Sequence, residues 1–297
     1  ICNFGWFGAQ VLESANSLSP APKILTIFHG DDMSRSLLAN GGNLYSDLFD
    51  QRQMLLPVSD FWSERLQQFG AREEDIFVHR MGVKTENFKY APKTRSNTDP
   101  FKLVTVCRFV EKKGLEYAIR GFAKAVSQAP DLTMRFELIG SGPLEASLKA
   151  LVRDLGISEL VSFSGALPHK EVAHALARSD ALVLPSVVSE DGDMEGIPLS
   201  LMEAMASGVG VISTYHSGIP ELIENGVSGL LAREKNCDQI ADHILTLARN
   251  PELAVTLTRN AREVIEEKFN STKLNDQLEE LCKRALTDSG VAPQNTE

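Results

Sequence analysis

Two glutamates with seven residues between them are the residues of this sequence best suited to chemistry. Glu195 comes before Gly-Ile-Pro, and Glu203 lies in the apolar segment that ends at Gly208. Pro198 favours the first turn of a helix, which places Glu195 before the helix and Glu203 more than one turn inside it. One carboxylate could then hold a sugar ring and the other a ribose, while helix N–H groups face phosphate. The alternative is a capping acid and a surface acid, but the flanking Gly-Ile-Pro and Ala-Met-Ala-Ser-Gly favour the nucleotide-sugar interpretation.

A basic segment after the apolar run 102–107 supplies the cations that such a ligand needs. Ligands of open α/β sheets bind outside the carboxyl ends of the strands, so Arg108 and Lys113 are placed for a diphosphate beside a helix N-terminus. Solvated loop charges are the alternative for an isolated basic loop, and the neighbouring motifs favour the diphosphate. Gly140 and Gly142 follow the run 134–139, where they would let the backbone approach a ligand closely.

Two other polar groups follow predicted strands. His29 ends the run 23–28, where it could donate to a sugar hydroxyl or phosphate, or be a loop histidine held by a nearby acid. Asp191 and Asp193 flank a glycine, a pattern that can hold Mg²⁺ but is more typical of an exposed turn. We therefore predict no metal site. The other histidines show no pairing by spacing and are interpreted as structural: His79, His169, His174, His216 and His243.

The composition indicates an ordinary globular protein of 297 residues that can bury a substantial core. Its formal net charge of -10 argues against a nucleic-acid surface, which usually carries an excess of Lys and Arg. The four cysteines form no C-x-x-C pair, so neither a zinc site nor a disulfide framework is predicted, and a reducing cytoplasm is expected. No apolar run is long enough to span a bilayer, so any membrane association would be peripheral. The sequence opens at Ile1, in what reads as a strand and a loop, and we expect further residues upstream.

Short apolar runs alternate with helix-type segments, the pattern of parallel sheets built from βαβ units. The predicted fold class is α/β, because most runs lack the polar alternation of half-exposed strands. The polar stretch 89–100 contains two prolines and predicts a domain boundary, and residues 236–286 are predicted to be helical, with a polar tail from 287. The predicted strands are 23–28, 54–58, 76–80, 102–107, 134–139, 160–163, 180–184 and 209–213.

Four motifs, taken in order, resemble a known enzyme family. They are Cys107-Arg-Phe-Val-Glu-Lys-Lys-Gly114, Gly140-Ser-Gly-Pro143, the stretch from Glu195 to Gly208, and Ser217-Gly-Ile-Pro-Glu221 followed by Gly226-Val-Ser-Gly229. Together they resemble the donor domain of retaining GT-B glycosyltransferases, and more narrowly the Glu-seven-Glu family, the glycosyl transferases group 1. The segments 191–198 and 216–221 are similar to members that assemble exopolysaccharides such as colanic acid or amylovoran.

This resemblance implies a GT-B fold, with two Rossmann-like domains facing a cleft and the N-terminal domain incomplete. It divides the chain into an acceptor-side domain at 1–92, an NDP-sugar donor domain at 93–268, and a C-terminal segment at 269–297, whose helix crosses back onto the first domain and ends in the polar tail. The roles that it implies are diphosphate contacts for Arg108 and Lys113, the transferred sugar for Glu195, the ribose for Glu203, the sugar from across the cleft for His29, and the base for Leu167. The other implied donor-binding positions are Gly140, Gly142, Gly196, Ile197, Pro198 and Leu199.

By the same resemblance, members transfer a sugar with retention from an NDP-sugar to a glycan or an undecaprenyl-linked acceptor, and they need no metal or cofactor. We therefore expect a hexosyltransferase of cell-surface polysaccharide biosynthesis, in the cytoplasm or peripherally at the inner face of the plasma membrane. Its implied catalytic residues are Arg108, Lys113, Glu195 and His29. The alternatives are a noncatalytic nucleotide-sugar-binding fragment, because the first domain lacks its leading strands, and an NDP-sugar 2-epimerase, which shares the fold but is not favoured by the Glu-seven-Glu segment.

Overall fold

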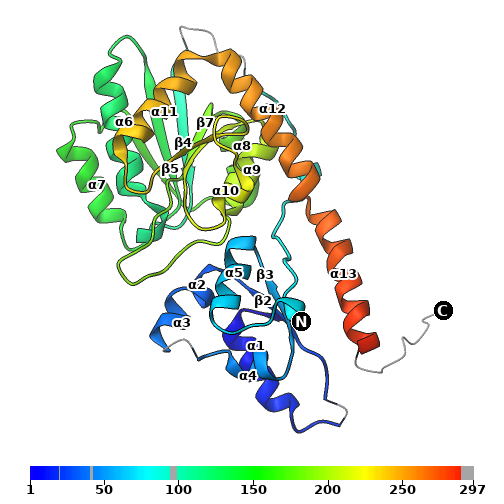
Figure 1. Ribbon diagram of the computed structural model, residues 1–297. Helices are drawn as coiled ribbons and strands as arrows, with labels where there is room; N and C mark the ends of the chain where they lie inside the picture. The colour runs from blue at the N-terminus through cyan, green and yellow to red at the C-terminus, as the bar shows by residue number, and fades with distance from the viewer. Residues whose placement is uncertain (20, 41–42, 94–98, 289–297) are drawn as a thin grey trace.

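The computed structural model describes residues 1–19, 21–40, 43–93 and 99–288, which form two lobes, each built on a parallel sheet (Figure 1). The strands are β1 (Cys2–Asn3), β2 (Leu25–Phe28), β3 (Met54–Pro57), β4 (Phe101–Val106), β5 (Met134–Ile139), β6 (Val161–Gly165), β7 (Ala181–Val183), β8 (Gly210–Thr214) and β9 (Leu230–Ala232). The α-helices are α1 (Gly5–Ala15), α2 (Gly30–Met33), α3 (Arg35–Ala39), α4 (Ser46–Asp50), α5 (Asp60–Gln68), α6 (Leu115–Gln128), α7 (Glu145–Asp154), α8 (His169–Ala177), α9 (Leu199–Ser207), α10 (Ile219–Leu222), α11 (Cys237–Arg249), α12 (Pro251–Lys268) and α13 (Ser271–Asp288). The 3₁₀ helices are η1 (Glu73–Asp75), η2 (Thr85–Asn87) and η3 (Glu111–Lys113).

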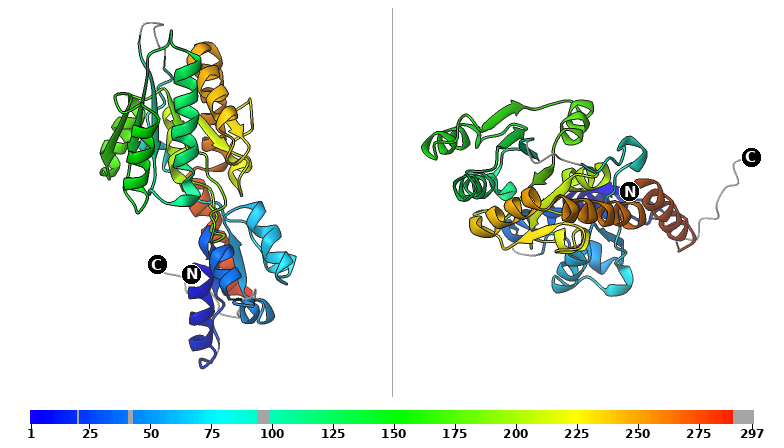
Figure 2. Two further views of the ribbon diagram at one scale, coloured as in Figure 1. Left: turned by 90° about the vertical axis from the view of Figure 1, so that its left-hand side faces the viewer. Right: turned by 90° about the horizontal axis from the view of Figure 1, so that it is seen from above.

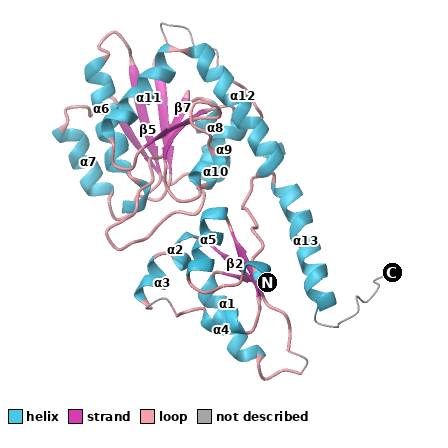
Figure 3. Ribbon diagram, viewed as in Figure 1, coloured by secondary structure: helices cyan, strands magenta, loops and turns pink. Residues whose placement is uncertain are grey.

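The N-terminal lobe consists of β1 to β3 with α1 to α5 and α13. Its described strands pair in the order β1-β2-β3, and all pairs are parallel. Figure 3 shows helices α1 to α5 around this small sheet. Helix α13 belongs to this lobe although it lies at the other end of the chain, because Ala285 joins the buried core and Leu278, Leu281 and Cys282 pack against it. The C-terminal segment thus crosses from one lobe to the other, as the views in Figure 2 also show.

The C-terminal lobe consists of β4 to β9 with α6 to α12. The described strands pair in the order β6-β5-β4-β7-β8-β9, all parallel. One buried cluster includes side chains of α6, α7 and α11 and another those of α8, α9 and α10, while α12 contributes to both. The strand order reverses between β4 and β7, and open α/β sheets bind ligands in the crevice at such a switch point. A ligand site is therefore expected at the loops after β4 and β7.

Seven of the eight predicted strands are present within one or two residues of their predicted ends, and the strand predicted at 76–80 is wrong. This segment lies beside β3 but makes an isolated bridge at Ile76, with N–H bonds from Phe77 to Leu55 at 2.8 Å and from His79 to Pro57 at 2.9 Å. It follows the 3₁₀ turn η1, and its pairing with β3 stops at this one bridge and these two hydrogen bonds. Strand β9 was not among the predicted strands.

The expected loop after the first strand is also wrong, because helix α1 begins at Gly5. Gly8 lets this helix pack closely on β2. A Cβ atom at Gly8 would lie 2.3 Å from Oγ1 of Thr26. The glycine therefore serves helix-to-sheet packing, and Leu12 and Ala15 complete the buried face of α1.

The division of the chain at 92/93 and 268/269 stays a prediction. The described strands lie at 2–57 and 101–232, on either side of the first of these positions. Residues 94–98 of the predicted boundary stretch, and residues 289–297 of the predicted polar tail, lie outside the described residues. Among the helices that are described, none combines the length and the apolar character that crossing a membrane requires.

Asp32 is a fully buried acid at the start of the short helices that follow β2. Its carboxylate accepts hydrogen bonds from the N–H groups of Gly5 and His29, both at 2.7 Å. Burial raises the pKa of Asp32 to about 6, although these two donors act in the opposite direction. The folded chain therefore keeps a proton on Asp32 at pH values at which the unfolded chain has released it.

We expect this difference to make the protein less stable as the pH rises. The contribution of Asp32 to stability is complete below about pH 4 and is lost as the pH passes 6, a change of up to about 3 kcal/mol. Urea unfolding between pH 4 and 7 should give a less steep dependence for Asp32→Asn, which cannot titrate. Parallel pH profiles of the two proteins would contradict this assignment.

Candidate functional site

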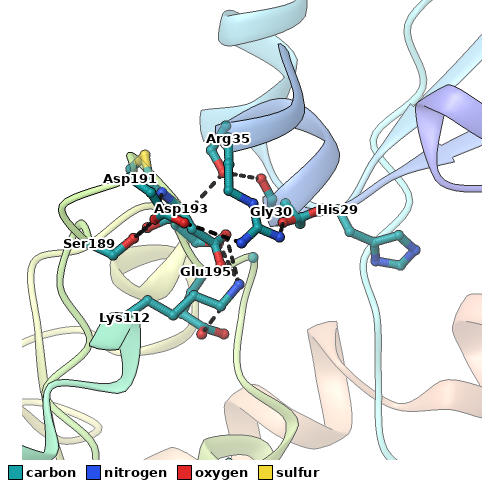
Figure 4. Close-up of polar contacts among 12 residues, drawn as sticks. His29, Gly30, Arg35, Lys112, Ser189, Asp191, Asp193 and Glu195 are labelled. Carbon is teal, nitrogen blue, oxygen red and sulfur yellow. Dashed lines mark hydrogen bonds and ion pairs between the residues drawn. The ribbon is translucent and has the colours of Figure 1, made fainter. Parts of the chain in front are cut away.

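The loops after β4 and β7 bring a lysine pair and two carboxylates together at the switch point. Lys112 and Lys113 end η3 in the first loop, and Asp193 and Glu195 lie in the second. Figure 4 shows Lys112, Asp193 and Glu195 of the C-terminal lobe close to Gly30 and Arg35 of the N-terminal lobe. The site therefore lies where the two lobes meet.

Glu195 is 7% exposed and is held by the lysine pair. Its Oε2 atom lies 2.9 Å from Nζ of Lys113, and its Oε1 atom lies 4.0 Å from Nζ of Lys112. Lys112 is itself buried and contacts Oδ1 of Asp193 at 2.9 Å and the carbonyl oxygen of Met194 at 3.2 Å. Within the described part of the chain, Oε1 of Glu195 is a buried acceptor without a hydrogen bond. Such an atom is costly unless a ligand donor pairs with it.

Glu203 lies within α9, more than one turn after its first residue, Leu199, as predicted. Its carboxylate is largely buried, and Oε1 lies 3.2 Å from Nε2 of His169, the first residue of α8. Burial raises the pKa of Glu203, while the hydrogen bond with His169 acts in the opposite direction. Leu167, two residues before His169, is partly buried against the same core as α9. The structure thus brings the loop that carries Leu167 next to the helix that carries Glu203.

The residues between the two glutamates lead into this helix. Pro198 precedes its first residue, Leu199, which is 44% exposed, whereas Ile197 is buried. Gly196 faces the N-terminal lobe, since a Cβ atom there would lie 3.2 Å from Val58. The segment 196–199 therefore lies between the helix that carries Glu203 and the opposite lobe.

The glycines of the Gly-Ser-Gly-Pro motif fit against the loop after β4. A Cβ atom at Gly140 would lie 1.8 Å from the carbonyl oxygen of Cys107, and one at Gly142 would lie 2.5 Å from that of Phe109. The N–H of Phe109 donates to Ser141 at 2.8 Å. These glycines are required by contact with protein backbone, and this contact fixes the loop that carries Arg108 and the lysines.

Arg108 is exposed and lines a cavity of about 490 Å³ between the lobes. Its guanidinium makes no ion pair with another described residue, in contrast to the two lysines. The same cavity is lined from the N-terminal lobe by Phe4, Asp31 and Arg35. The predicted cations therefore divide into Lys113, which is paired with Glu195, and Arg108, which faces the open cavity.

His29 occupies the predicted position at the end of β2, but its ring does not join the lysine and carboxylate group. Figure 4 shows the imidazole directed away from Glu195. The ring instead packs against Phe4, with 4.7 Å between the ring centroids, and burial lowers its pKa. The neighbouring Gly30 is the residue that touches the opposite lobe, because a Cβ atom there would lie 2.4 Å from the carbonyl oxygen of Met194.

Asp191 and Asp193 are held by protein cations. Oδ2 of Asp191 lies 3.2 Å from Nη1 of Arg35, across the lobes, and Asp193 pairs with Lys112. A hydrogen bond from Ser189 and the N–H of Asp193 together lower the pKa of Asp191 to about 2. Among the described residues, no three His, Cys, Asp or Glu side chains gather as a metal site would require. The acidic loop is thus tied to both lobes through cations.

Glu221 joins the lobes at a second place. Its carboxylate, on α10, accepts from the N–H groups of Asp60 at 3.0 Å and Phe61 at 2.9 Å, and it lies 2.9 Å from Arg80. Asp60 and Phe61 begin α5, and the first N–H groups of a helix have no partner within it. A carboxylate at this end also interacts favourably with the helix dipole. Glu221 therefore caps a helix of the opposite lobe.

We expect Glu221→Ala to lower the free energy of unfolding by about 1 to 3 kcal/mol, because it leaves two helix N–H groups without their acceptor. Arg80 also loses one of its two partners and keeps Asp60. Urea unfolding measures this loss. Glu224→Ala, at an exposed position two residues after α10, is the matched control and should stay within about 0.5 kcal/mol of the wild type. Equal losses in the two variants would exclude a role of Glu221 in joining the lobes.

Comparison with known proteins supports the predicted fold and the family resemblance of the motifs. The sequence profile described as "Glycosyl transferases group 1" matches residues 86–264. The putative colanic acid biosynthesis glycosyltransferase WcaL of Escherichia coli is 40% identical over 264 residues, which are 88% of this chain and 64% of WcaL. The amylovoran biosynthesis glycosyltransferase AmsK of Erwinia amylovora is 37% identical over 285 residues, which are 96% of this chain and 69% of AmsK. The chain thus spans 64–69% of the length of these relatives.

Solved structures show the same fold at low sequence identity. HepE from Anabaena, in complex with UDP and glucose, superposes with a TM-score of 0.75 at 20% identity, over 94% of this chain and 77% of HepE. Sucrose-phosphate synthase from Thermosynechococcus elongatus superposes with a TM-score of 0.79 at 20% identity, over 96% of this chain and 73% of the synthase. The fold is therefore GT-B-like, as predicted. Together with the profile match, these findings show that the chain belongs to the glycosyl transferases group 1 family.

Proposed function

We propose that this chain carries the donor site of a retaining glycosyltransferase that moves a hexose from an NDP-sugar to a glycan or lipid-linked acceptor in cell-surface polysaccharide biosynthesis. Family membership and the similarity to colanic acid and amylovoran glycosyltransferases support this proposal. The HepE complex adds that a protein of this fold binds UDP together with glucose. The acceptor side would lie in the N-terminal lobe, across the cavity that Arg108 lines.

The observation that carries the proposal is the state of the Glu195 carboxylate. One of its oxygens is held by Lys113, and the other is a buried acceptor that lacks a hydrogen bond within the described residues. Hydroxyl groups of a sugar would supply the missing donor, and the contact with Lys113 fixes the direction of the carboxylate. Because the atom is covered in this arrangement, we expect the donor to enter when the lobes separate and to be enclosed when they close.

In this proposal the positively charged side chains promote the reaction by electrostatic stabilisation. Arg108 and Lys113 stabilise the negative charge that grows on the diphosphate as its bond to the sugar breaks. The acceptor hydroxyl forms the new bond on the same face of the sugar, and its proton passes to the departing phosphate oxygen. Closure of the lobes excludes water that would otherwise hydrolyse the donor.

The remaining contacts would position the nucleotide. Glu203, with its carboxylate turned towards α8, would accept from the ribose hydroxyls, and the loop around Leu167 would offer backbone groups to the base. The N-terminus of α9, with Gly196 to Leu199, would direct its N–H groups at the phosphates. His29 would reach the sugar after a rotation of its ring away from Phe4.

Calorimetric titration of the purified chain with UDP, GDP and ADP, and then with the matching sugar nucleotides, tests the donor site. We expect one base to bind selectively in the presence of EDTA, because protein cations rather than a metal ion meet the diphosphate. A folded chain that binds none of these compounds would sink the proposal. If EDTA strongly inhibited binding, a metal ion and not the protein cations would contact the diphosphate.

Turnover then separates the transferase from its alternatives. Transfer requires an acceptor, whereas epimerisation of an NDP-sugar proceeds without one, and a noncatalytic fragment binds the donor without consuming it. Incubation of the chain with the sugar nucleotide that it binds, with and without membrane-extracted lipid-linked glycan, distinguishes the three. We expect the sugar nucleotide to be consumed only when the lipid-linked glycan is present.

A further inference from the structure

His216 is the most deeply buried histidine near the site and is not accounted for by the proposed donor contacts. It follows β8, is 1% exposed, and lies between the loops that carry Glu195 and Glu234. Its Nε2 atom accepts the backbone N–H of Glu195 at 3.1 Å, and its Nδ1 atom lies 2.6 Å from Oε1 of Glu234. Its spacing in the sequence gave no sign of either partner, because both come from other loops.

These two contacts determine where the proton of the ring lies. A backbone N–H can only donate, so Nε2 must be the unprotonated nitrogen. Nδ1 then carries the proton and donates it to the Glu234 carboxylate. Glu234 is fixed in turn by the N–H of Val188, which donates to its Oε2 atom at 3.0 Å. Burial alone would raise the pKa of Glu234, but the hydrogen bonds from His216 and Val188 outweigh it, and the pKa is lowered.

The next residue holds the other side of the same peptide. Oγ of Ser217 donates to the carbonyl oxygen of Glu195 at 2.7 Å. Consecutive side chains therefore bind both backbone groups of Glu195, while Lys113 binds its carboxylate. Glu195 lies in a loop before α9, where no regular ladder of backbone hydrogen bonds would fix it.

We propose that His216, Ser217 and Glu234 form a backbone clamp whose function is to position the Glu195 carboxylate for the sugar of the donor. Glu234 selects the His216 tautomer that accepts from Glu195, and Ser217 prevents the peptide from rotating. All three are positioning residues, because they act through Glu195. The inference rests on the proposed function in one respect, the contact between Glu195 and the sugar.

The tautomer is tested without any ligand. Nitrogen-15 NMR of the imidazole groups, with the His216 signals assigned by their loss in His216→Gln, should show a protonated Nδ1 and an unprotonated Nε2. In Glu234→Leu, which removes the acceptor, the proton should shift towards Nε2, whereas Glu234→Gln keeps an acceptor and should retain the wild-type tautomer. A wild-type ring protonated at Nε2 would overturn the clamp.

The positioning role is tested by calorimetry with UDP-glucose and UDP. If the first titration shows that the chain binds GDP or ADP instead, that diphosphate and its sugar nucleotide are used. We expect His216→Phe, Glu234→Leu and Ser217→Ala to weaken binding of the sugar nucleotide roughly tenfold and to leave binding of the diphosphate within about twofold. His216→Gln, whose amide oxygen can accept from the Glu195 N–H, should recover part of the loss. Thermal unfolding of each variant identifies any that fails to fold. If the other variants do not fold, Ser217→Ala, which is the smallest change, still tests the positioning role.

The outcomes separate the clamp from the function on which it rests. Equal weakening of sugar nucleotide and diphosphate, or unchanged affinity in all folded variants, would overturn the positioning role. If the wild-type chain bound neither compound, the proposed function would fail, while the NMR result would still decide whether Glu234 and the Glu195 N–H fix the ring of His216.

Discussion

Replacing Glu195 by alanine is expected to weaken binding of the sugar nucleotide by about 10- to 150-fold, the equivalent of about 1.5 to 3 kcal/mol for one charge-assisted hydrogen bond. Binding of the nucleoside diphosphate should change little, because only the donor carries the sugar that this carboxylate would contact. Calorimetric titration of the variant with both compounds measures the difference. Glu195→Gln keeps the size of the side chain and should show most of the same loss, since it removes the charge that Lys113 holds in place.

Glu203→Ala is the matched comparison, because the second glutamate would contact the ribose that both compounds share. We expect it to weaken binding of the diphosphate and of the sugar nucleotide alike. If neither substitution altered affinity for the donor, the assignment of both glutamates would be wrong. A loss confined to the sugar nucleotide in both variants would instead move Glu203 from the ribose to the sugar.

Gly30→Ala is expected to reduce turnover about 100-fold, because it prevents the lobes from meeting at the site. The added Cβ atom would lie 2.4 Å from the carbonyl oxygen of Met194 and 2.7 Å from the carbonyl carbon of Glu195. Both are backbone atoms, which cannot rotate away, and a displacement of about 1 Å in a catalytic site can cost two orders of magnitude in rate. Donor consumption by the variant measures the effect.

Amide hydrogen exchange gives a readout that does not depend on turnover. The N–H of Met194 donates to Oγ of Ser34 across the lobes at 3.1 Å, and we expect its exchange to become faster in Gly30→Ala. Gly210→Ala is the control, since its Cβ atom would first meet the movable end of Leu247 at 3.2 Å, far from the lobe contact. Unchanged protection of Met194 in Gly30→Ala would show that the lobes tolerate the methyl group.

The sequence was sufficient to predict where Glu195, Glu203 and Lys113 lie along the strands and helices, because these positions follow from local rules, whereas their roles stay predictions. Apolar runs of strand length identify the parallel strands, and the carboxyl ends of such strands meet at one edge of the sheet. A residue that follows β4 must therefore lie near one that follows β7 once these strands are neighbours. Pro198 and Gly208 likewise bound a helix wherever the tertiary structure places it, and α9 runs between them.

The parts that sequence reasoning missed are contacts between elements far apart in the chain. His169 was interpreted as structural, yet it contacts Glu203, and Glu221 was noted only within a motif, yet it caps α5. The signal available was weak in both cases: a histidine that starts a helix after a predicted strand, and an acid after Gly-Ile-Pro. The orientation of His29 could not be predicted either, because it depends on the packing of its ring against Phe4.

The passage of α13 back to the N-terminal lobe has a consequence for synthesis on the ribosome. The strands and helices of the C-terminal lobe lie at 101–268, so this lobe can be completed once this continuous stretch has emerged. The N-terminal lobe, although made first, must wait for Leu278, Leu281 and Ala285 to cover its core. Domains usually fold in the order in which they are translated. Here the first-made lobe is completed last, and until then its apolar face is available to chaperones.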